Sequence, residues 1–283
     1  MAKYEKQWSS AEPGLMLFLI DQSGSMIEPW ENKTRAEQTA LVINRVINEI
    51  VLKNMDGGAP KNRTYISLIG YGGSNNIDVI NKGFLADLAN APLRLEKNKQ
   101  KQPDGNGGII EVPIESPIWL DPVSKGYTPM AGALETAKEI IEKWISKRPE
   151  SPASIIINIT DGMAYNGNEN DPMEEVNKTI SVFKDIENIK TSRDEAPLIF
   201  NVHIGGDKTK VGFPENESEV GSDEMAKFLF QISSVVPEAI RKSAKNLSFP
   251  IKENSRAFIA NADLIDLIEF IEFGSSQAVV DKK

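Results

Sequence analysis

The chain has 283 residues, of which 40% are hydrophobic, and its 41 acidic and 32 basic side chains give a formal net charge of −9. This acidic balance argues against a nucleic-acid binder or a peripheral membrane protein, because both usually present a basic face. The absence of cysteine excludes disulfides, zinc–thiolate sites and cysteine nucleophiles. The length suffices for a full hydrophobic core, and we predict one domain over residues 12–275, with tails at 1–11 and 276–283.

The first half of the domain begins with alternating predicted strands and a helix. Residues 15–20 are a continuous apolar run, as expected of a strand that is covered on both faces. Residues 34–53 place their apolar side chains on one helical stripe. Residues 64–69 and 78–85 are predicted as two further strands. The apolar run at 15–20 is too short for a signal-peptide core or a membrane span, and together with the lack of cysteine it predicts a cytoplasmic protein.

Residues 86–127 form the least regular stretch, with several prolines and a glycine-rich turn at 104–108. Residues 109–114 have the composition of a strand, but Pro113 restricts such a strand to the edge of a sheet. We interpret the stretch as an insertion carried by the domain.

Regular alternation returns after residue 128. Further helices are predicted over residues 129–144, 171–189, 222–244 with a break near Pro237, and 263–273. Further strands are predicted over residues 154–159, 198–204 and 256–260. Strands that alternate with helices of these lengths indicate a doubly wound α/β domain, with a mostly parallel sheet and helices on both faces.

Oxygen-bearing side chains cluster where predicted strands end, which is where such sheets bind ligands. Asp21, Ser23 and Ser25 follow the first strand at alternate positions, Asp161 follows the strand at 154–159, and Thr128 precedes the helix between them. Two carboxylates and three hydroxyls are hard donors that suit Mg²⁺, or Ca²⁺ or Mn²⁺, better than zinc or copper.

The loop after the first strand has the spacing that such a site needs. Its oxygens at positions i, i+2 and i+4 can turn toward one point, and Gly24 is expected to give the backbone the freedom to curl. Two aspartates only neutralise a divalent ion, so the metal remains electrophilic at an open position. An acidic side chain from another protein can bind there, which favours recognition over a closed structural site.

Three short motifs resemble the metal-ion-dependent adhesion site of von Willebrand factor A (VWA) domains: DQSGSM at residues 21–26, GYTP at 126–129 and TDG at 160–162. The resemblance covers residues 12–274. It implies the doubly wound fold and a magnesium ion that accepts an aspartate or glutamate from a protein partner. The residues that match its metal ligands are Asp21, Ser23, Ser25, Thr128 and Asp161.

Within that family, the cysteine-free chain and the segment 228–243 look most like the bacterial tellurium-resistance TerY-like branch. This resemblance implies work beside a protein kinase and a phosphatase in stress-response or phage-defence gene clusters. The 86–127 insertion and the loop at 72–76 depart from the compact family pattern, and they leave the partner open because partner specificity usually resides in such loops.

Enzyme alternatives fit the same residues less well. A magnesium-dependent phosphatase of the haloacid-dehalogenase type also has an aspartate after its first strand, but it needs a second carboxylate where Ser23 stands. A serine hydrolase needs a base beside its serine, and His203 lies within a predicted strand, which favours a structural role. We therefore predict a non-enzymatic, metal-dependent interaction module, with a scaffold that has a degenerate site as a further alternative.

Overall fold

The computed structural model describes residues 3–72, 76–103, 109–205, 209–242, 244 and 247–278. Its centre is a seven-stranded sheet in the order β12-β13-β11-β10-β1-β6-β7. The strands are β1 Gly14–Asp21, β6 Thr64–Gly72, β7 Asn76–Phe84, β10 Ile155–Thr160, β11 Leu198–Ile204, β12 Val211–Gly212 and β13 Phe258–Ala262. The five inner strands run parallel, and β7 and β12 are antiparallel edges. The predicted α/β class with a mostly parallel sheet is confirmed.

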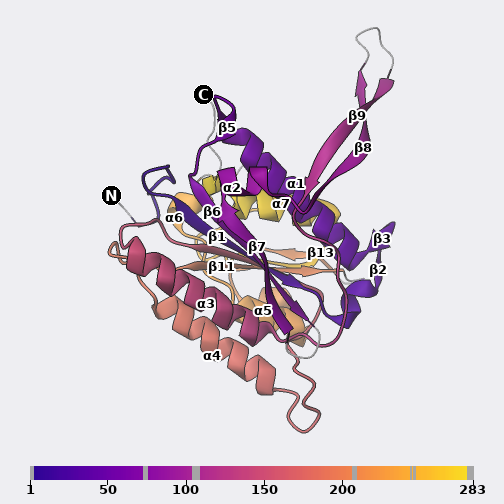
Figure 1. The fold of residues 1–283 in the computed structure, drawn as a ribbon. Coiled ribbons are helices and arrows are strands. Elements are labelled where there is room, and N and C mark those ends of the chain that lie inside the picture. Colours follow the sequence, from indigo (N-terminus) through magenta and orange to yellow (C-terminus); the bar gives the residue numbers. More distant parts are fainter. Residues whose placement is uncertain are drawn as a thin grey trace.

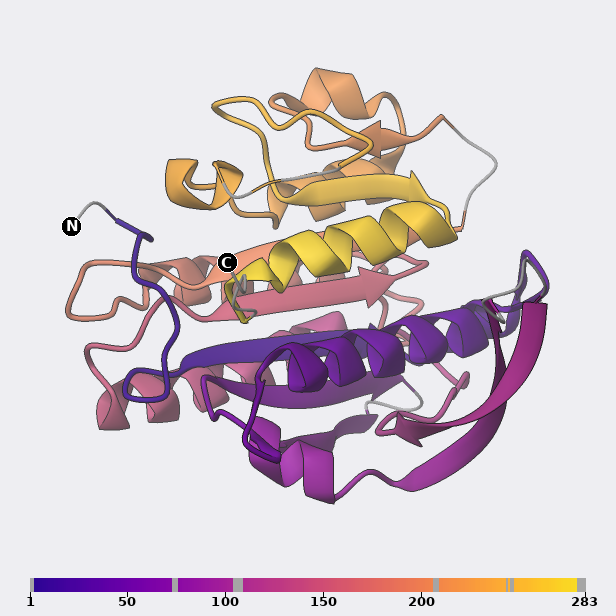
Figure 2. The same ribbon diagram turned by 90° about the horizontal axis from the view of Figure 1, so that it is seen from above.

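Helices cover both faces of this sheet (Figures 1 and 2). One face carries α1 Arg35–Lys53, α2 Leu85–Asn90, α6 Glu238–Arg241 and α7 Leu264–Gly274. The other carries α3 Met130–Lys147, α4 Glu174–Asn188 and α5 Glu224–Gln231. Each face therefore has its own hydrophobic core, as a doubly wound fold requires. No helix within the described ranges is long and apolar enough to cross a membrane.

Strand β1 shows why its sequence is apolar at every position. Successive side chains of a strand point to opposite faces of the sheet. Met16, Phe18 and Ile20 accordingly join the core under α1 and α7, whereas Leu17 and Leu19 join the core under α3. A run that is buried on both faces cannot alternate with polar residues, and β1 ends where Asp21 begins the polar loop.

Helix α1 begins at Arg35 because the preceding residue caps it. The Thr34 hydroxyl accepts a hydrogen bond from the Glu37 N–H, and the Glu37 carboxylate accepts one from the Thr34 N–H at 2.8 Å. This reciprocal arrangement is a capping box, which satisfies two backbone donors at the start of a helix. It sets the position of Arg35 in the first turn of α1.

The predicted break near Pro237 in the helix over residues 222–244 is present, but it is longer than expected. Helix α5 ends at Gln231 and α6 begins at Glu238. Between them, the Ser234 N–H donates to the Ile199 carbonyl at 2.9 Å, and the Ser234 carbonyl accepts from the Ala257 N–H at 2.8 Å. The backbone here bonds to neighbouring strand segments, so it cannot also form helical hydrogen bonds.

Smaller differences concern element boundaries. Helix α4 begins at Glu174 instead of residue 171, because the Asp171 carbonyl and carboxylate accept hydrogen bonds from the next backbone N–H groups in a turn. Strand β13 begins two residues later than predicted. Short elements complete the chain: β2 Pro29–Trp30, β3 Lys33–Thr34, β4 Met55–Asp56, β5 Ala59–Pro60, and 3₁₀ turns at Gly24–Ile27, Glu217–Val220 and Ser276–Ala278.

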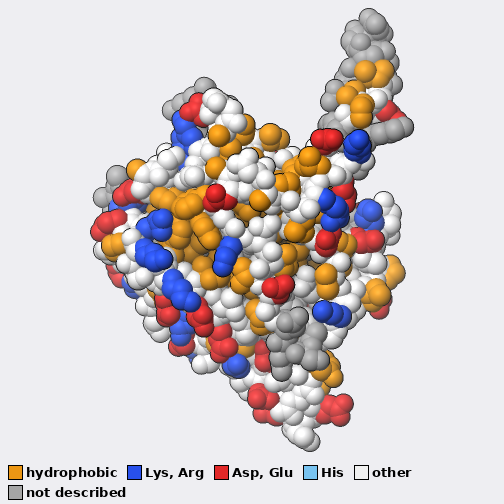
Figure 3. Space-filling view, viewed as in Figure 1, with side chains coloured by type: hydrophobic (Ala, Val, Ile, Leu, Met, Phe, Trp, Pro, Cys, Tyr) orange, Lys and Arg blue, Asp and Glu red, His pale blue; other side chains and the backbone are white. Residues whose placement is uncertain are grey.

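The irregular stretch after residue 86 contains a two-stranded ribbon, which we call the arm. It consists of β8 Arg94–Pro103 and β9 Ile109–Ile118, and it stands clear of the body (Figures 1 and 3). The expected strand at 109–114 is present and longer, whereas β8 was not expected. The predicted turn at 104–108 lies outside the described residues, as does the centre of the loop at 72–76.

Prolines determine which edge of the arm is open. Pro117 lies opposite Leu95, and Pro113 lies opposite Lys99. Proline has no N–H, so it is favoured at positions whose nitrogen points away from the partner strand. The nitrogen atoms of both prolines therefore face the outer edge of β9.

Candidate metal-binding site

The candidate site lies where the order of the sheet reverses. Strand β1 is flanked by β6 on one side and by β10 on the other, so the chain leaves β1 in one direction and later returns on the opposite side. Asp21 ends β1, and Asp161 follows the last residue of β10. The two carboxylates thus meet at the switch point, the usual ligand position of this architecture.

Backbone hydrogen bonds join the three predicted segments. The Gly24 N–H donates to the Gly126 carbonyl at 2.9 Å, and the Lys125 N–H donates to the Gln22 carbonyl at 2.7 Å. Thr128 exchanges two backbone hydrogen bonds with Tyr165, at 2.8 and 3.0 Å. Loops 21–27, 125–128 and 161–165 therefore form one unit, which we call the site edge.

The glycine that the site edge needs is not the expected one. Gly24 is not among the residues with positive φ, so the conformational freedom expected of it is not used. Gly126 has a φ of 70°, a left-handed conformation that favours glycine. The sharp bend is therefore in the second loop, where Gly126 turns its carbonyl toward Gly24.

Four of the five predicted ligands are connected through their side chains. The Asp21 carboxylate accepts the Ser23 N–H at 2.8 Å, and the Ser23 and Ser25 hydroxyls are 3.1 Å apart. The Ser25 hydroxyl donates to Asp161 Oδ1 at 2.7 Å. Thr128 is buried, and its loop is joined to the first loop by the hydrogen bond from Gly24 to Gly126. Ser25 is exposed, so this row of oxygens opens to solvent at that residue.

Burial makes the negative charge of the site costly. Asp21 is 1% exposed, and burial, followed by the nearby charge of Asp161, raises the pKa of its carboxyl from 3.8 to about 7. Hydrogen bonds from Thr160, at 2.6 Å, and from Ser23 act in the opposite direction. A cation stabilises two carboxylates that are buried close together. The burial of these two carboxylates is the observation that best fits a metal.

A buried polar network lies below Asp21, and sequence reasoning missed it. The Tyr71 hydroxyl donates to the Asn158 amide oxygen at 2.8 Å, and the Asn158 amide donates to Asn201 at 2.9 Å. Burial raises the pKa of Tyr71 well above its ordinary value, so the phenol stays neutral. Thr160 connects this network to Asp21. The two amides, Asn158 and Asn201, lie within apolar strand segments, for which the sequence predicted only a place in the core.

Two side chains outside the motifs contact Asp161. Arg35 Nη1 lies 2.7 Å from Asp161 Oδ2, a charged contact that sequence reasoning missed. His203 is hydrogen-bonded to the Asp161 backbone, and its Nδ1 accepts the Asn261 N–H at 3.3 Å. Burial lowers the pKa of His203, so the ring is neutral. These contacts fit the structural role expected for this histidine.

The donor set distinguishes possible metals. Within the described ranges, no three His, Asp or Glu side chains gather as a metal-binding group. The site edge offers two carboxylates and hydroxyl oxygens instead. These are the ligands of Mg²⁺, Ca²⁺ or Mn²⁺, and hydration water commonly completes a magnesium site. The residues present therefore fit a hard divalent ion.

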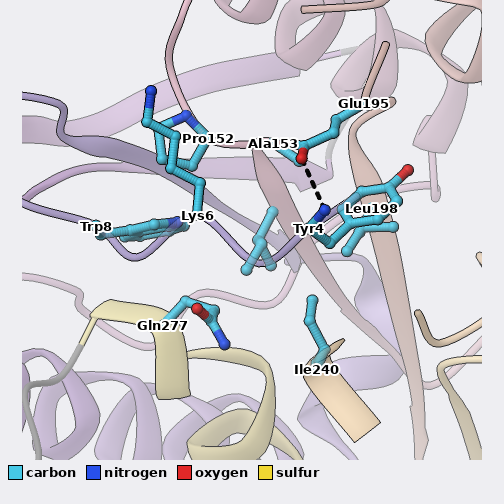
Figure 4. A pocket seen from close by; sticks show the side chains of 10 residues that line it. Tyr4, Lys6, Trp8, Pro152, Ala153, Glu195, Leu198, Ile240 and Gln277 are labelled. Carbon is cyan, nitrogen blue, oxygen red and sulfur yellow. Dashed lines mark hydrogen bonds between the residues drawn. The ribbon is translucent and has the colours of Figure 1, made fainter. Parts of the chain in front are cut away.

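A separate hollow lies at the opposite ends of the parallel strands. It is lined by Trp8, Pro152 and Leu198, among others, and the Tyr4 N–H donates to Glu195 Oε1 at 2.7 Å beside it (Figure 4). Its volume of about 10 Å³ holds one water at most. This hollow is too small for an organic ligand.

Comparison with known proteins supports the fold. No family model and no curated protein matches the sequence. Among solved structures, the pilus adhesin SpaC from Lactobacillus rhamnosus GG is similar at 13% identity with a TM-score of 0.55. The match covers 96% of this chain but 31% of SpaC, so this chain spans about a third of that protein. The doubly wound fold is thus one that a pilus adhesin also contains.

Two further solved structures are similar at lower scores. The vWF domain of the type V pili tip protein Mfa5 from Porphyromonas gingivalis has 13% identity and a TM-score of 0.46, with 96% of this chain and 98% of that chain covered. The PilB minor pilin from Streptococcus sanguinis has 12% identity and a TM-score of 0.46, with 94% and 62% covered.

Proposed function

We propose that the chain is a metal-dependent protein-interaction module of the VWA type, without catalytic activity of its own. The metal would be Mg²⁺, or Ca²⁺ or Mn²⁺, and the partner would supply an aspartate or glutamate. The ligands would be Asp21, Ser23, Ser25, Thr128 and Asp161. The observation that carries the proposal is the row of joined oxygens at the switch point, which is buried at Asp21 and exposed at Ser25.

The roles of the residues follow from their surroundings. Asp21 and Asp161 would supply negative charge directly or through water, and the hydroxyls of the two serines and Thr128 would complete the protein's share. The bound ion supplies an electrophilic position that a partner's carboxylate can occupy. Because Ser25 is the exposed member of the row, the partner would approach from its side.

The biological setting remains a prediction from the resemblance. The TerY-like features imply a cytoplasmic partner such as a protein kinase or phosphatase, in a stress-response or phage-defence system. SpaC is described as a pilus adhesin. The proposal for the site does not depend on the compartment, because the ligands, the ion and the partner's carboxylate would be the same inside or outside a cell.

Calorimetry tests the metal site. We expect Asp21→Ala to weaken Mg²⁺ binding by about 100-fold, because it removes one of two charged ligands. Asp185→Ala is the matched control, since that aspartate lies on α4 and pairs with Lys138 at the surface. Circular dichroism should show an unchanged fold in both variants. Equal Mg²⁺ affinity in the native protein and Asp21→Ala would contradict the proposal.

Two further assays separate the alternatives. Affinity capture with and without a chelator should release the partner when Mg²⁺ is removed, whereas a scaffold with a degenerate site would keep it. A chromogenic phosphate ester with Mg²⁺ should give no turnover. Turnover that disappears in Asp21→Ala would favour the phosphatase of the haloacid-dehalogenase type.

A further inference from the structure

Asp161 already has a cationic partner from within the chain. Arg35 Nη1 lies 2.7 Å from Asp161 Oδ2, and the side chains are 21% and 0% exposed, respectively. A pair this well buried is not equivalent to a surface ion pair, because solvent screens it much less. Arg35 thus neutralises part of the charge that a metal at the site edge would use.

The fold makes room for this contact. The capping box at Thr34 places Arg35 in the first turn of α1, beside the loop that contains Asp161. Gly205 lies against the Arg35 side chain. A Cβ on this residue would be 2.6 Å from Arg35 Nε and 3.2 Å from Cζ. Only glycine leaves space for the guanidinium at this position.

The arrangement of Arg35 also has a cost. Its Nε is buried and has no hydrogen-bond partner among the described residues. An unpaired buried donor opposes folding, because it loses its hydrogen bonds to water and gains none in return. Since packing and hydrogen bonding do not satisfy Nε, the charge pair with Asp161 is what holds the side chain in place.

We infer that Arg35 is an internal competitor of the metal, so that the Arg35–Asp161 ion pair and the bound divalent ion weaken each other. The inference rests on the proposed function. When both carboxyls are ionised, as metal binding requires, the two aspartates carry a charge of −2 without Arg35, and with it the set carries −1. A divalent ion attracted to the same carboxylate is repelled by the guanidinium. By linkage, the metal must weaken the ion pair by the factor by which the ion pair weakens the metal.

This competition has a consequence for the partner. A partner's carboxylate brings a further negative charge to a place that holds both a divalent ion and a guanidinium. It is attracted by both cations and offsets their repulsion. Metal and acidic partner should therefore bind cooperatively, with the metal held weakly until the partner arrives.

Removal of the charge tests the inference. We expect Arg35→Gln to bind Mg²⁺ about tenfold more tightly in calorimetry, because the opposing charge is lost. Arg35→Lys keeps the charge and should stay within about threefold of the native affinity. Arg45→Gln is the control on the exposed face of the same helix, where Arg45 pairs with Glu49. It should leave the affinity unchanged.

Thermal unfolding gives a second measurement. Arg35→Gln should lower the melting temperature in chelator, because Asp161 loses its partner, yet show a larger increase on addition of Mg²⁺ than the native protein. If Arg35 had only a structural role, Arg35→Gln would lower the melting temperature equally in chelator and in Mg²⁺. If Arg35→Gln does not fold, Gly205→Ala keeps every charge but displaces the guanidinium, and it should raise Mg²⁺ affinity in the same direction.

The outcomes separate the two proposals. Equal or weaker Mg²⁺ binding in Arg35→Gln, with binding still abolished by Asp21→Ala, overturns the competition but leaves the metal site standing. Absence of Mg²⁺, Ca²⁺ and Mn²⁺ binding in both the native protein and Arg35→Gln overturns the proposed function and the competition together.

Discussion

The site edge and the arm are built in opposite ways. The site edge joins the loop at 21–27 to two loops about 100 residues or more further along the chain, and its side chains bond to one another and to the buried strands beneath. The arm pairs neighbouring strands with each other in a sheet of its own (Figure 1). A two-stranded ribbon is marginal in water unless something else packs against it.

This contrast indicates where stability and function should be coupled. Changes at the site edge disturb contacts that hold the parallel strands together, so they should alter metal binding and folding at once. Changes in the arm beyond its root should alter neither. The following predictions test that division, from the largest expected effect to the smallest.

The largest effect concerns pH at the site edge. Asp21 has a pKa of about 7 in the folded metal-free protein, against an ordinary value of 3.8. The folded state therefore binds more protons between these values, and the contribution of Asp21 to stability improves as the pH falls from 8 to 4. The difference amounts to about 4 kcal/mol at most.

Denaturant unfolding in chelator, at pH 8 and pH 5, measures this effect against Asp21→Asn as the control. Asp21→Asn should lack the gain in the free energy of unfolding at pH 5. In the native protein, Mg²⁺ should make this gain smaller, because it stabilises the ionised carboxylate at pH 8. Identical pH dependence in both proteins would show that Asp21 does not carry the buried charge.

The second effect concerns the network below the site. Asn158→Ala removes the partner of the Tyr71 hydroxyl and of the Asn201 amide and leaves a cavity between strands. We expect a loss of about 3 kcal/mol in the free energy of unfolding, together with weaker Mg²⁺ binding. Tyr71→Phe, which removes one hydroxyl and no volume, should cost less. A smaller loss of unfolding free energy in Asn158→Ala than in Tyr71→Phe would contradict the role of the network.

The third effect concerns the root of the arm. The Asn44 side chain on α1 accepts the Trp119 N–H at 2.8 Å and donates to the Leu120 carbonyl at 2.8 Å. Asn44→Ala should cost about 2 kcal/mol by leaving these buried groups unpaired. Asn48→Ala, one turn further along α1, is the control. Unfolding should register the loss, while Mg²⁺ affinity should change far less than in Asp21→Ala, since Asn44 bonds to Trp119 and Leu120 rather than to a candidate ligand.

The smallest effect is expected from the arm itself. Replacement of residues 97–115 by an Asn-Gly turn joins Glu96 to Ser116, which lie opposite each other in the ribbon. The free energy of unfolding should change by less than about 1 kcal/mol, and Mg²⁺ affinity should not change. A loss of several kcal/mol would show that the arm belongs to the folding unit, which would refute the division.

Much of the fold and most of the candidate site were predictable because their signals are local. A strand buried on both faces must be apolar throughout, as in residues 15–20. Asp21, Ser23 and Ser25 lie within one loop, so their convergence requires only a turn. The order of strands then brings Asp161 to the same edge.

The missed features depend on contacts between distant segments. Arg35 occupies an ordinary first-turn position, and its contact with Asp161 depends on the space at Gly205. Strand β8 consists mainly of Lys, Gln and Glu and has no apolar alternation, so only its pairing with β9 reveals it. The segment after Gln231 has helical composition, but its hydrogen bonds to Ile199 and Ala257 override that preference.

The prolines of β9 limit how this protein can assemble. Pro113 and Pro117 offer no amide hydrogen to a chain that pairs along the outer side of β9, so addition of a strand is disfavoured there. The prolines thus act against open-ended growth of a sheet through the arm.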